Sequence, residues 1–249
     1  MSHIHVSPDR LLMYGDLAPW FHLLTAPADY AEEAAFISGQ FDDACEPGPQ
    51  TVLELGSGGG NNASHLKRRF ELTLVDLSEG MLELSRGLNP ECRHILGDMR
   101  QIRIDGWFDG VLVHDAIMYM TTRHDLELAA QTAFVHCRPG GVALFLPDCV
   151  AESFRPETRH GGHDSPEGHG MRYLEWTFDP DPEDTHFDSA FVYMLRDAPG
   201  KVRVFSEHHR MGLFSRAVWH TVLEGVGFEV ESVVDRWDRE VFIALRPEG

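Results

Sequence analysis

Short apolar runs alternate with helical patterns through the middle of the chain. The apolar runs occupy residues 51–55, 72–75, 94–96, 108–113 and 142–146. Between them, apolar residues recur at helical spacing, as from His124 to Cys137. Strands that alternate with helices through short turns require a parallel sheet with helices on both faces. We therefore predict an α/β fold for this region.

The pattern changes on either side of this region. Residues 11–44 predict two helices, and the prolines of Glu46-Pro47-Gly48-Pro49 end that block. Residues 148–172 are polar and rich in Gly and Pro, which predicts a mobile loop. Alternating residues within 173–212 predict an antiparallel ribbon, followed by a helix over 214–226 and strands over 228–233 and 240–245.

Composition narrows the class of protein. The chain has 249 residues, 43% of them hydrophobic, and needs neither disulfides nor metals to hold a core of this size. Asp and Glu number 40 against 21 Lys and Arg, a net charge of -19 that disfavours nucleic acids and anionic membranes as partners. No apolar run is long enough to span a membrane, and Met1–His5 lack the features of a signal peptide. Four scattered cysteines without a CxxC pair indicate reduced thiols in a cytoplasmic protein.

A glycine-rich loop, Glu54-Leu55-Gly56-Ser57-Gly58-Gly59-Gly60, joins the first apolar strand to the next helix. Glycines allow a sharp turn and a close approach to a ligand, and the helix behind presents free N–H groups. Asp76 ends the next strand, where a carboxylate can accept both ribose hydroxyls of an adenosine. Asp98 ends the third strand, within reach of an adenine amino group. Together these features predict an adenosine derivative at the carboxyl ends of the strands.

The spacing of the loop discriminates among adenosine cofactors. A dinucleotide fingerprint counted from Gly56 has Asn61 where its third glycine belongs. Counted from Gly58 it ends acceptably at Ala63, but its first glycine then lies three residues past Leu55. No Gly-Lys-Ser/Thr of a P-loop follows. A nicotinamide-dependent oxidoreductase and a cofactor-binding protein without catalysis therefore stay as rival interpretations.

The motif set resembles the class I S-adenosylmethionine-dependent methyltransferases. The resemblance covers residues 50–147 and runs through Glu54–Gly60, Val75–Ser78, Gly97–Met99, Phe108–Asp109 and Arg138–Gly141. It implies a Rossmann-like seven-stranded, mostly parallel sheet with an antiparallel last strand, plus an antiparallel β insertion after strand five. The implied single domain comprises an N-terminal helical lid (1–46), a cofactor-binding core (47–147), a substrate-covering insertion (148–212) and a C-terminal helix with the last two strands (213–249).

The same resemblance implies which residues contact S-adenosyl-L-methionine and its product S-adenosyl-L-homocysteine. The glycine loop would lie under the methionine part, Asp76 would hold the ribose, and Asp98 would contact the adenine. Tyr14 would reach the cofactor from the lid, where Phe21-His22 replaces the Tyr-Asp of many relatives. The full expected set is Tyr14, Glu54, Gly56, Ser57, Gly58, Gly60, Asp76, Leu77, Met81, Asp98, Met99 and His114.

A weaker similarity outside residues 50–147 indicates which kind of molecule accepts the methyl group. Residues 29–33 and 203–214 resemble bacterial N,N-dimethyltransferases of amino sugars, in which the ribbon covers the sugar site. This predicts in-line methyl transfer to a small-molecule amine, with an O-methyltransferase as the alternative. Amino-methylating DNA, RNA and glutamine enzymes resemble one another in an Asn/Asp-Pro-Pro-Tyr turn, but here the turn reads His114-Asp115-Ala116-Ile117. We expect no nucleic-acid or membrane partner, and a monomer or homodimer.

The catalytic candidates are His114, Tyr119 and His209. His208 and His209 are neighbours on a predicted strand, so only one can face the cleft, and His209 is favoured. Asp115 and Glu207 are further candidates. The stretch with His160, His163 and His169 could bind zinc, but its glycines and the lack of a nearby cysteine favour a solvated lid, so no metal is predicted.

Overall fold

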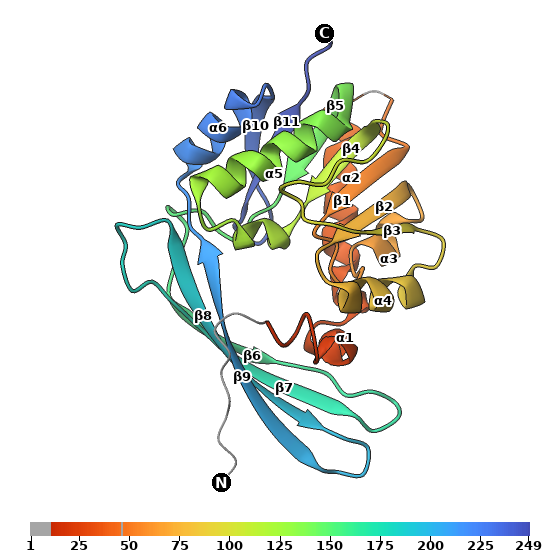
Figure 1. Ribbon diagram of the computed structural model, residues 1–249, viewed down its shortest axis with the longest axis vertical. Helices are drawn as coiled ribbons and strands as arrows, with labels where there is room; N and C mark the ends of the chain where they lie inside the picture. Colours follow the sequence, from red (N-terminus) through yellow and green to blue (C-terminus); the bar gives the residue numbers. More distant parts are fainter. Residues whose placement is uncertain (1–10, 46) are drawn as a thin grey trace.

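Two β-sheets organise the chain in the computed structural model, which describes residues 11–45 and 47–249 (Figure 1). The larger sheet has the order β10-β11-β5-β4-β1-β2-β3, and the smaller has the order β6-β7-β8-β9. The strands are β1 Thr51–Leu55, β2 Glu71–Asp76, β3 Arg93–Leu96, β4 Phe108–Val113, β5 Cys137–Phe145, β6 Glu157–Gly161, β7 Gly170–Phe178, β8 His186–Arg196, β9 Val202–Gly212, β10 Glu229–Val234 and β11 Glu240–Leu245. The helices are α1 Phe21–Leu24, α2 Ala31–Ala44, α3 Ala63–Leu66, α4 Glu79–Leu88, α5 Arg123–His136 and α6 Arg216–Gly225, with short 3-10 turns at Ala18–Trp20, Pro27–Tyr30 and Asp115–Tyr119.

The larger sheet is Rossmann-like, as predicted. β1, β2, β3, β4 and β5 pair in parallel, whereas β11 runs antiparallel to both β5 and β10. Side chains alternate across each strand, so Leu53 and Leu55 face α5 and α6 while Val52 faces α2 and α3. Helices therefore cover both faces of the sheet. A ligand of such a sheet binds at the carboxyl ends of its parallel strands.

The four-stranded sheet is the predicted antiparallel insertion after strand five. Its inner face packs Met171, Tyr193 and Leu195 against Met13 and Leu17 of the N-terminal segment. Its outer face leaves large apolar side chains exposed: Leu174, Trp176, Val192, Met194 and Val204. Figure 1 shows residues 11–30, called the N-terminal segment below, lying between the two sheets. That segment can therefore contact both the parallel strands and the insertion.

Three local predictions were wrong. Residues 11–24 do not form a regular helix, because Gly15 and Pro19 break the pattern into turns and the single turn α1. The helix predicted after the glycine loop is only a single turn, which ends at Leu66. Residues 157–161, predicted as loop, form β6, whose backbone pairs with β7.

Some predictions fall outside the described residues or concern the whole chain. The predictions that concern Met1–His5 and Glu46 fall on residues outside the described ranges. Within those ranges, no helix combines the length and apolar character needed to cross a bilayer.

Candidate functional site

A cavity of about 840 Å³ lies at the carboxyl ends of the parallel strands. Its volume is within the usual range for cofactor and substrate sites. The residues that line it come from the N-terminal segment, from the ends of β1 to β5 and from β9. They include the predicted Tyr14, Gly56, Gly58, Asp76, Leu77, Asp98, Met99 and Tyr119.

The glycine loop turns sharply beneath this cavity. Gly56, Gly58 and Gly60 have φ angles of 80°, 53° and 79°, in the region that favours glycine. A Cβ on Gly56 would stand 2.3 Å from the Cβ of Ala116, so the loop also packs closely against the turn after β4. Gly60 serves a different purpose, because it faces α4 and its carbonyl accepts a hydrogen bond of 2.9 Å from Asn89 Nδ2. Gly56 and Gly58 line the cavity, and Gly60 holds the loop to α4.

Asp76 lies at the end of β2 with its carboxylate fixed by backbone donors. The N–H of Gly58 donates to Oδ2 at 2.7 Å, and the N–H of Ser78 donates to Oδ1 at 2.8 Å. Burial raises the pKa of Asp76, and these hydrogen bonds oppose the rise. The side chain still lines the cavity. Its remaining lone pairs can accept hydroxyl donors such as those of a ribose.

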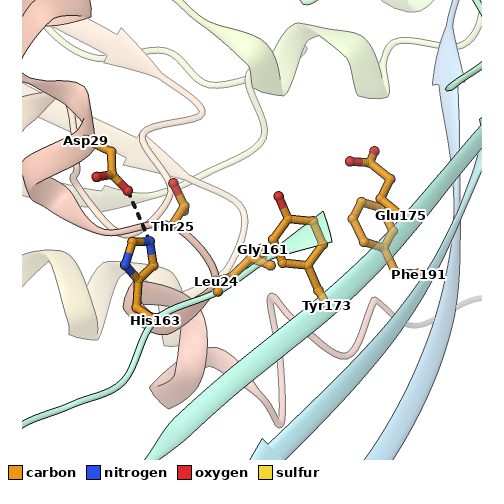
Figure 2. Close-up of a pocket in the computed structure, with 9 residues that line it drawn as sticks. Leu24, Thr25, Asp29, Gly161, His163, Tyr173, Glu175 and Phe191 are labelled. Carbon is orange, nitrogen blue, oxygen red and sulfur yellow. Dashed lines mark ion pairs between the residues drawn. The ribbon is translucent and has the colours of Figure 1, made fainter. Parts of the chain in front are cut away.

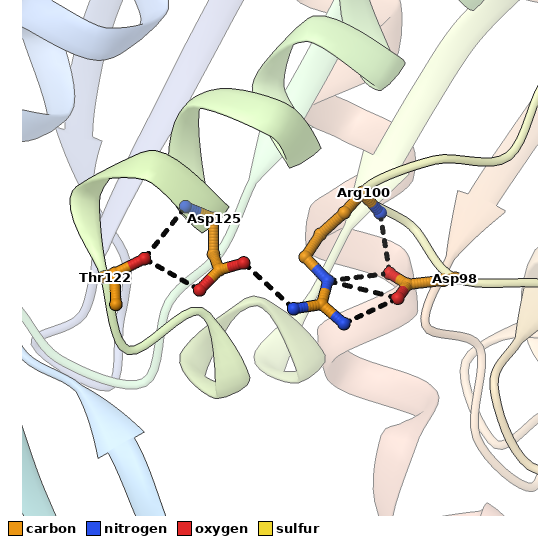
Figure 3. A network of polar contacts seen from close by, with 4 residues as sticks. All are labelled: Asp98, Arg100, Thr122 and Asp125. Carbon is orange, nitrogen blue, oxygen red and sulfur yellow. Dashed lines mark hydrogen bonds and ion pairs between the residues drawn. The ribbon is translucent and has the colours of Figure 1, made fainter.

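Asp98 belongs to a charged network at the end of β3 (Figure 3). The guanidinium of Arg100 binds both carboxylate oxygens, with its Nη2 2.6 Å from Oδ2, and its Nη1 lies 2.9 Å from Asp125. Asp125 is itself held by Thr122, the N-cap of α5. Arg100 keeps the pKa of Asp98 below its usual value, so the carboxylate is ionised. The network holds the Asp98 carboxylate, a hydrogen-bond acceptor, beside Leu77 and Met99, both of which line the cavity.

The N-terminal segment packs directly on the glycine loop. Nε2 of His22 lies 3.1 Å from the carbonyl oxygen of Gly59, and a Cβ on Gly59 would approach the Phe21 ring to 2.7 Å. The hydroxyl of Ser78 donates to the carbonyl of Tyr14, which ties the segment to the start of α4. The Phe21-His22 pair thus contacts the loop, and Tyr14 lines the cavity as predicted.

A chain of polar side chains leads from the cavity into the insertion. The Tyr119 hydroxyl lies 2.9 Å from the Tyr14 hydroxyl and 2.7 Å from Nδ1 of His209. Nε2 of His209 lies 2.9 Å from Glu207, which also accepts a hydrogen bond of 2.7 Å from Tyr193. His209 is buried and His208 is exposed, as strand alternation requires. Tyr119 lines the cavity, whereas His209 stands behind it.

His114 is buried away from the cavity. Its Nε2 lies 3.0 Å from Glu33 of α2 and its Nδ1 lies 3.2 Å from Asp115. Burial lowers the pKa of His114, but Asp115 and Glu33 outweigh burial and raise it well above its ordinary value. The ring therefore links α2 to Asp115. The structure brings Asp115, and not His114, to the cavity wall.

Asp148 is a site residue that sequence reasoning missed. It follows β5 and lines the cavity together with Asp115, which follows β4. The Asp148 side chain is open to solvent, but the protein mass around it and the charge of Asp115 raise its pKa to about 6. The only signal in the sequence is its place just after a strand, because strands β4 and β5 are neighbours and their ends must meet.

The remaining predicted cofactor residues lie behind the cavity. Glu54 and Ser57 are buried, and among the described residues neither Oε2 of Glu54 nor Oγ of Ser57 has a hydrogen-bond partner. Burial raises the pKa of Glu54 to about 8. Such orphaned polar atoms beside the glycine loop fit a ligand that carries ammonium and carboxylate groups. Met81 is fully buried in α4 and does not line the cavity.

The histidine-rich stretch does not converge on one point. His160 is exposed on β6, His163 lies 3.1 Å from Asp29, and His169 contacts the ring of Trp20. In the parts of the chain that the structure describes, no group of three or more His, Cys, Asp or Glu residues is arranged to hold a metal ion. Gly161, Gly162 and His163 of this stretch instead line a second, smaller cavity (Figure 2).

Comparisons with known proteins agree with this geometry. Residues 52–141 match the protein family described as methyltransferase domain. The match covers the glycine loop, Asp76 and Asp98, which the structure brings to one cavity. Residues 52–141 therefore form a methyltransferase domain, and the protein is an enzyme that uses S-adenosyl-L-methionine as its cofactor.

Its relatives include sugar N-methyltransferases. The chain is 28% identical over 219 residues to dTDP-3-amino-3,4,6-trideoxy-alpha-D-glucopyranose N,N-dimethyltransferase of Streptomyces venezuelae, covering 82% of this chain and 85% of the relative. The solved sugar N-methyltransferase KedS8 from a Streptoalloteichus species superposes with a TM-score of 0.86 at 23% identity, over 100% of this chain and 98% of the other. The amino pentose methyltransferase CalS10 from Micromonospora echinaspora, solved with S-adenosylmethionine bound, gives a TM-score of 0.76 at 23% identity, over 87% of this chain and 91% of that chain.

Proposed function

We propose that this methyltransferase methylates the amine nitrogen of an amino sugar or a similar small metabolite. The observation that carries the proposal is the pair of carboxylates, Asp115 and Asp148, in the cavity that also holds the glycine loop and Asp76. An amine arrives mostly as an ammonium ion, which two carboxylates attract and orient. The Streptomyces venezuelae relative is an N,N-dimethyltransferase, and its activity supports the same chemistry.

The chain's own residues would hold the cofactor at its two ends. S-adenosyl-L-methionine supplies a methyl group on a sulfonium. Gly56 and Gly58 suit its methionine part, with Glu54 and Ser57 buried behind them, and Asp76 suits the ribose. Leu77, Met99 and Asp98 suit the adenine, with Arg100 holding the Asp98 carboxylate in place. Holding both reactants in line is the main catalytic task, because such positioning removes much of the barrier to methyl transfer.

The acceptor must also lose a proton, since an ammonium has no lone pair for attack. Asp148 suits this step, because a carboxylate with a pKa of about 6 is ionised at neutral pH and still basic enough to take a proton. Asp115 lies beside it and keeps the region negative. Tyr119, whose hydroxyl lies in the same cavity, would orient the acceptor. His209 and His114 then act as positioning residues behind Tyr119 and Asp115.

The proposal also covers the class of acceptor, the oligomeric state and the cellular setting. The acceptor is a small molecule and not a nucleic acid, in keeping with the net charge of -19. The protein acts as a monomer or a homodimer. A cytoplasmic setting is supported by the four free cysteines.

The first experiment tests the reaction itself. The protein is titrated calorimetrically with S-adenosyl-L-homocysteine and with NADH, and is then incubated with labelled S-adenosyl-L-methionine and a panel of amino sugars and their deaminated, hydroxyl-only analogues. We expect binding of the first ligand only and label on nitrogen by mass spectrometry. Label on oxygen of the hydroxyl analogues would establish the O-methyltransferase alternative. Binding without transfer to any amine would count against the proposal.

A variant at His209 tests the polar chain behind Tyr119. His209→Ala removes the ring that lies 2.7 Å from the Tyr119 hydroxyl, so we expect kcat to fall about tenfold, the weight of one hydrogen bond. The Kd for S-adenosyl-L-homocysteine should stay unchanged, because His209 does not line the cavity. His209→Asn, which can still hydrogen-bond to Tyr119, should restore most of kcat. Loss of cofactor affinity in His209→Ala would show that His209 contributes to cofactor binding instead.

A further inference from the structure

Glu207 is a buried carboxylate to which the proposed reaction gives no part. It lies on the inner face of β9 in the insertion, with 4% of its surface exposed. Its Oε2 accepts hydrogen bonds from the backbone N–H groups of Leu12 and Met13 in the N-terminal segment. Its Oε1 accepts a hydrogen bond of 2.7 Å from the Tyr193 hydroxyl and lies 2.9 Å from Nε2 of His209. One side chain thus joins strands β8 and β9 to the N-terminal segment.

The carboxylate of Glu207 is ionised and surrounded by donors. Burial raises its pKa, but His209, Tyr193 and the Met13 N–H stabilise the charge and bring the pKa below its ordinary value. A carboxylate offers about four lone-pair sites, and four polar groups meet it here. Because an ionised carboxylate can only accept, Nε2 of His209 must carry a hydrogen.

Each side of Glu207 leads to a tyrosine of the larger cavity. On one side, Tyr14 directly follows Met13, whose N–H is bound to Oε2. On the other side, Nδ1 of His209 lies 2.7 Å from the Tyr119 hydroxyl. The two tyrosine hydroxyls lie 2.9 Å apart, and both side chains line the cavity. Glu207 therefore holds the backbone next to Tyr14 and, through His209, the hydroxyl of Tyr119.

The N-terminal segment is also bound on the cofactor side of the cavity. The Ser78 hydroxyl donates to the carbonyl of Tyr14, and the Ser78 N–H donates to Asp76 at 2.8 Å. His22 of the same segment lies 3.1 Å from the carbonyl of Gly59 in the glycine loop. The segment is thus fixed to the cofactor site by these contacts and to the insertion by Glu207.

We propose that Glu207 is a positioning residue for methyl transfer, which sets Tyr14 through the N-terminal segment and Tyr119 through His209. Because one carboxylate holds both, a shift of the segment on the cofactor side disturbs the tyrosine pair as a unit. The proposal concerns how this chain arranges its own cavity wall, so it goes beyond the proposed function and does not depend on which acceptor is methylated.

Removal of the whole side chain tests the hold on the N-terminal segment. In Glu207→Ala the N–H groups of Leu12 and Met13 lose their acceptor, so we expect amide hydrogen exchange at both to become about tenfold faster. The Kd of S-adenosyl-L-homocysteine, measured by calorimetry, should rise about tenfold, because the segment packs on the glycine loop. Tyr193→Phe is the matched control: it removes a hydrogen bond from the same carboxylate but lies on neither route, so both readings should match the parent.

Glu207→Gln tests the route to Tyr119 with the volume of the side chain kept. Its amide oxygen can still accept from the N-terminal segment, so the Kd of S-adenosyl-L-homocysteine should stay within about twofold of the parent. Its NH2 group can only donate, so Nε2 of His209 must accept and Nδ1 then carries the hydrogen toward Tyr119. Nitrogen NMR of His209 should therefore show a protonated Nε2 in the parent and a bare Nε2 in Glu207→Gln. With the best amino sugar, kcat should fall about tenfold, as in His209→Ala.

Three results would overturn the proposal. They are unchanged exchange at Leu12 and Met13 in Glu207→Ala, an equal rise of the cofactor Kd in Tyr193→Phe, and a protonated Nε2 of His209 in Glu207→Gln. If Glu207→Ala does not fold, the NMR reading of Glu207→Gln decides alone. Exchange, cofactor binding and NMR need no acceptor, so a failure to methylate any amine would contradict the proposed function and leave these readings intact.

Discussion

The sequence predicts Asp76 as an acceptor for ribose hydroxyls, and the structure places its carboxylate in the wall of the cavity. It ends β2, and its carboxylate is oriented by the N–H groups of Gly58 and Ser78 before any ligand arrives. A preoriented acceptor of this kind loses little entropy when it binds a pair of hydroxyls. Asp76 is therefore the position where a single substitution reports on cofactor binding.

We expect Asp76→Ala to weaken binding of S-adenosyl-L-homocysteine by about 30-fold, since hydrogen bonds to a charged group contribute about 2 kcal/mol. Calorimetric titration measures the change, and Asp105→Ala, an exposed acid in the loop before β4, is the control. Unchanged affinity in Asp76→Ala would show that the ribose is held elsewhere.

Asp148 gives the reaction a defined pH dependence. Its pKa of about 6 means that the carboxylate is lost as pH falls through 6, so kcat/KM should decline on the acid side with that midpoint. Asp148→Asn cannot take a proton, and we expect kcat to fall by about 100-fold and the acid limb near pH 6 to disappear. The readout is the pH profile of methyl transfer to the best amino sugar. An unaltered acid limb in Asp148→Asn would assign that limb to another group.

At the scale of elements, local patterns and distant contacts were not equally predictable. The strand β4 and the glycine loop have strong local signals, because their apolar runs and turn residues are contiguous in the sequence. β6 lacks such a signal: its residues are exposed, and the strand exists because its backbone pairs with β7. Asp148 escaped notice for a related reason, since it reaches its cavity only through the pairing of strands. His114 was expected near the methyl group, but α2 supplies Glu33, which draws the ring away from the cavity.

Glu33 connects three elements and should contribute strongly to stability. It lies 3.0 Å from His114 after β4 and contacts Arg239, which directly precedes β11 and is also bound to Asp235. Burial alone would raise the pKa of Glu33, but His114 and Arg239 lower it to about 2. We expect Glu33→Gln to lower the free energy of unfolding by about 3 kcal/mol, because it removes one of the two carboxylate partners of each of His114 and Arg239.

Urea denaturation at neutral pH measures this change, and the adjacent Glu32→Gln is its control. Glu32 pairs with Arg236 at 2.9 Å on the surface, where such pairs contribute less than about 1 kcal/mol. Because the pKa of Glu33 is lower in the folded protein, its contribution is full above pH 4.5 and is lost as pH falls toward 2. The difference between parent and Glu33→Gln should therefore shrink over that range. Equal losses in both variants would contradict a special role for the buried cluster.

At the scale of the whole molecule, the net charge of -19 and the acids of the larger cavity act in the same direction. Asp115 and Asp148 place two carboxylates in the larger cavity, where we propose that the acceptor binds. Their negative field raises the local concentration of a cation and speeds its encounter with the site. S-adenosyl-L-homocysteine carries no net charge at neutral pH, so its binding serves as an internal reference.

Salt should therefore affect the two ligands differently. The screening length falls from about 30 Å at 0.01 M salt to about 8 Å at 0.15 M, so the field stops reaching an approaching cation. Between these concentrations we expect kcat/KM for a cationic amino glycoside to fall about fivefold, mainly through KM. The Kd of S-adenosyl-L-homocysteine should change less than about twofold, because a neutral ligand gains little from the field. Steady-state kinetics and calorimetry in the same buffers provide both numbers. A salt-independent kcat/KM, or a rise with salt, would mean that the acceptor reaches the site uncharged or anionic, and the electrostatic part of the proposed recognition would be wrong.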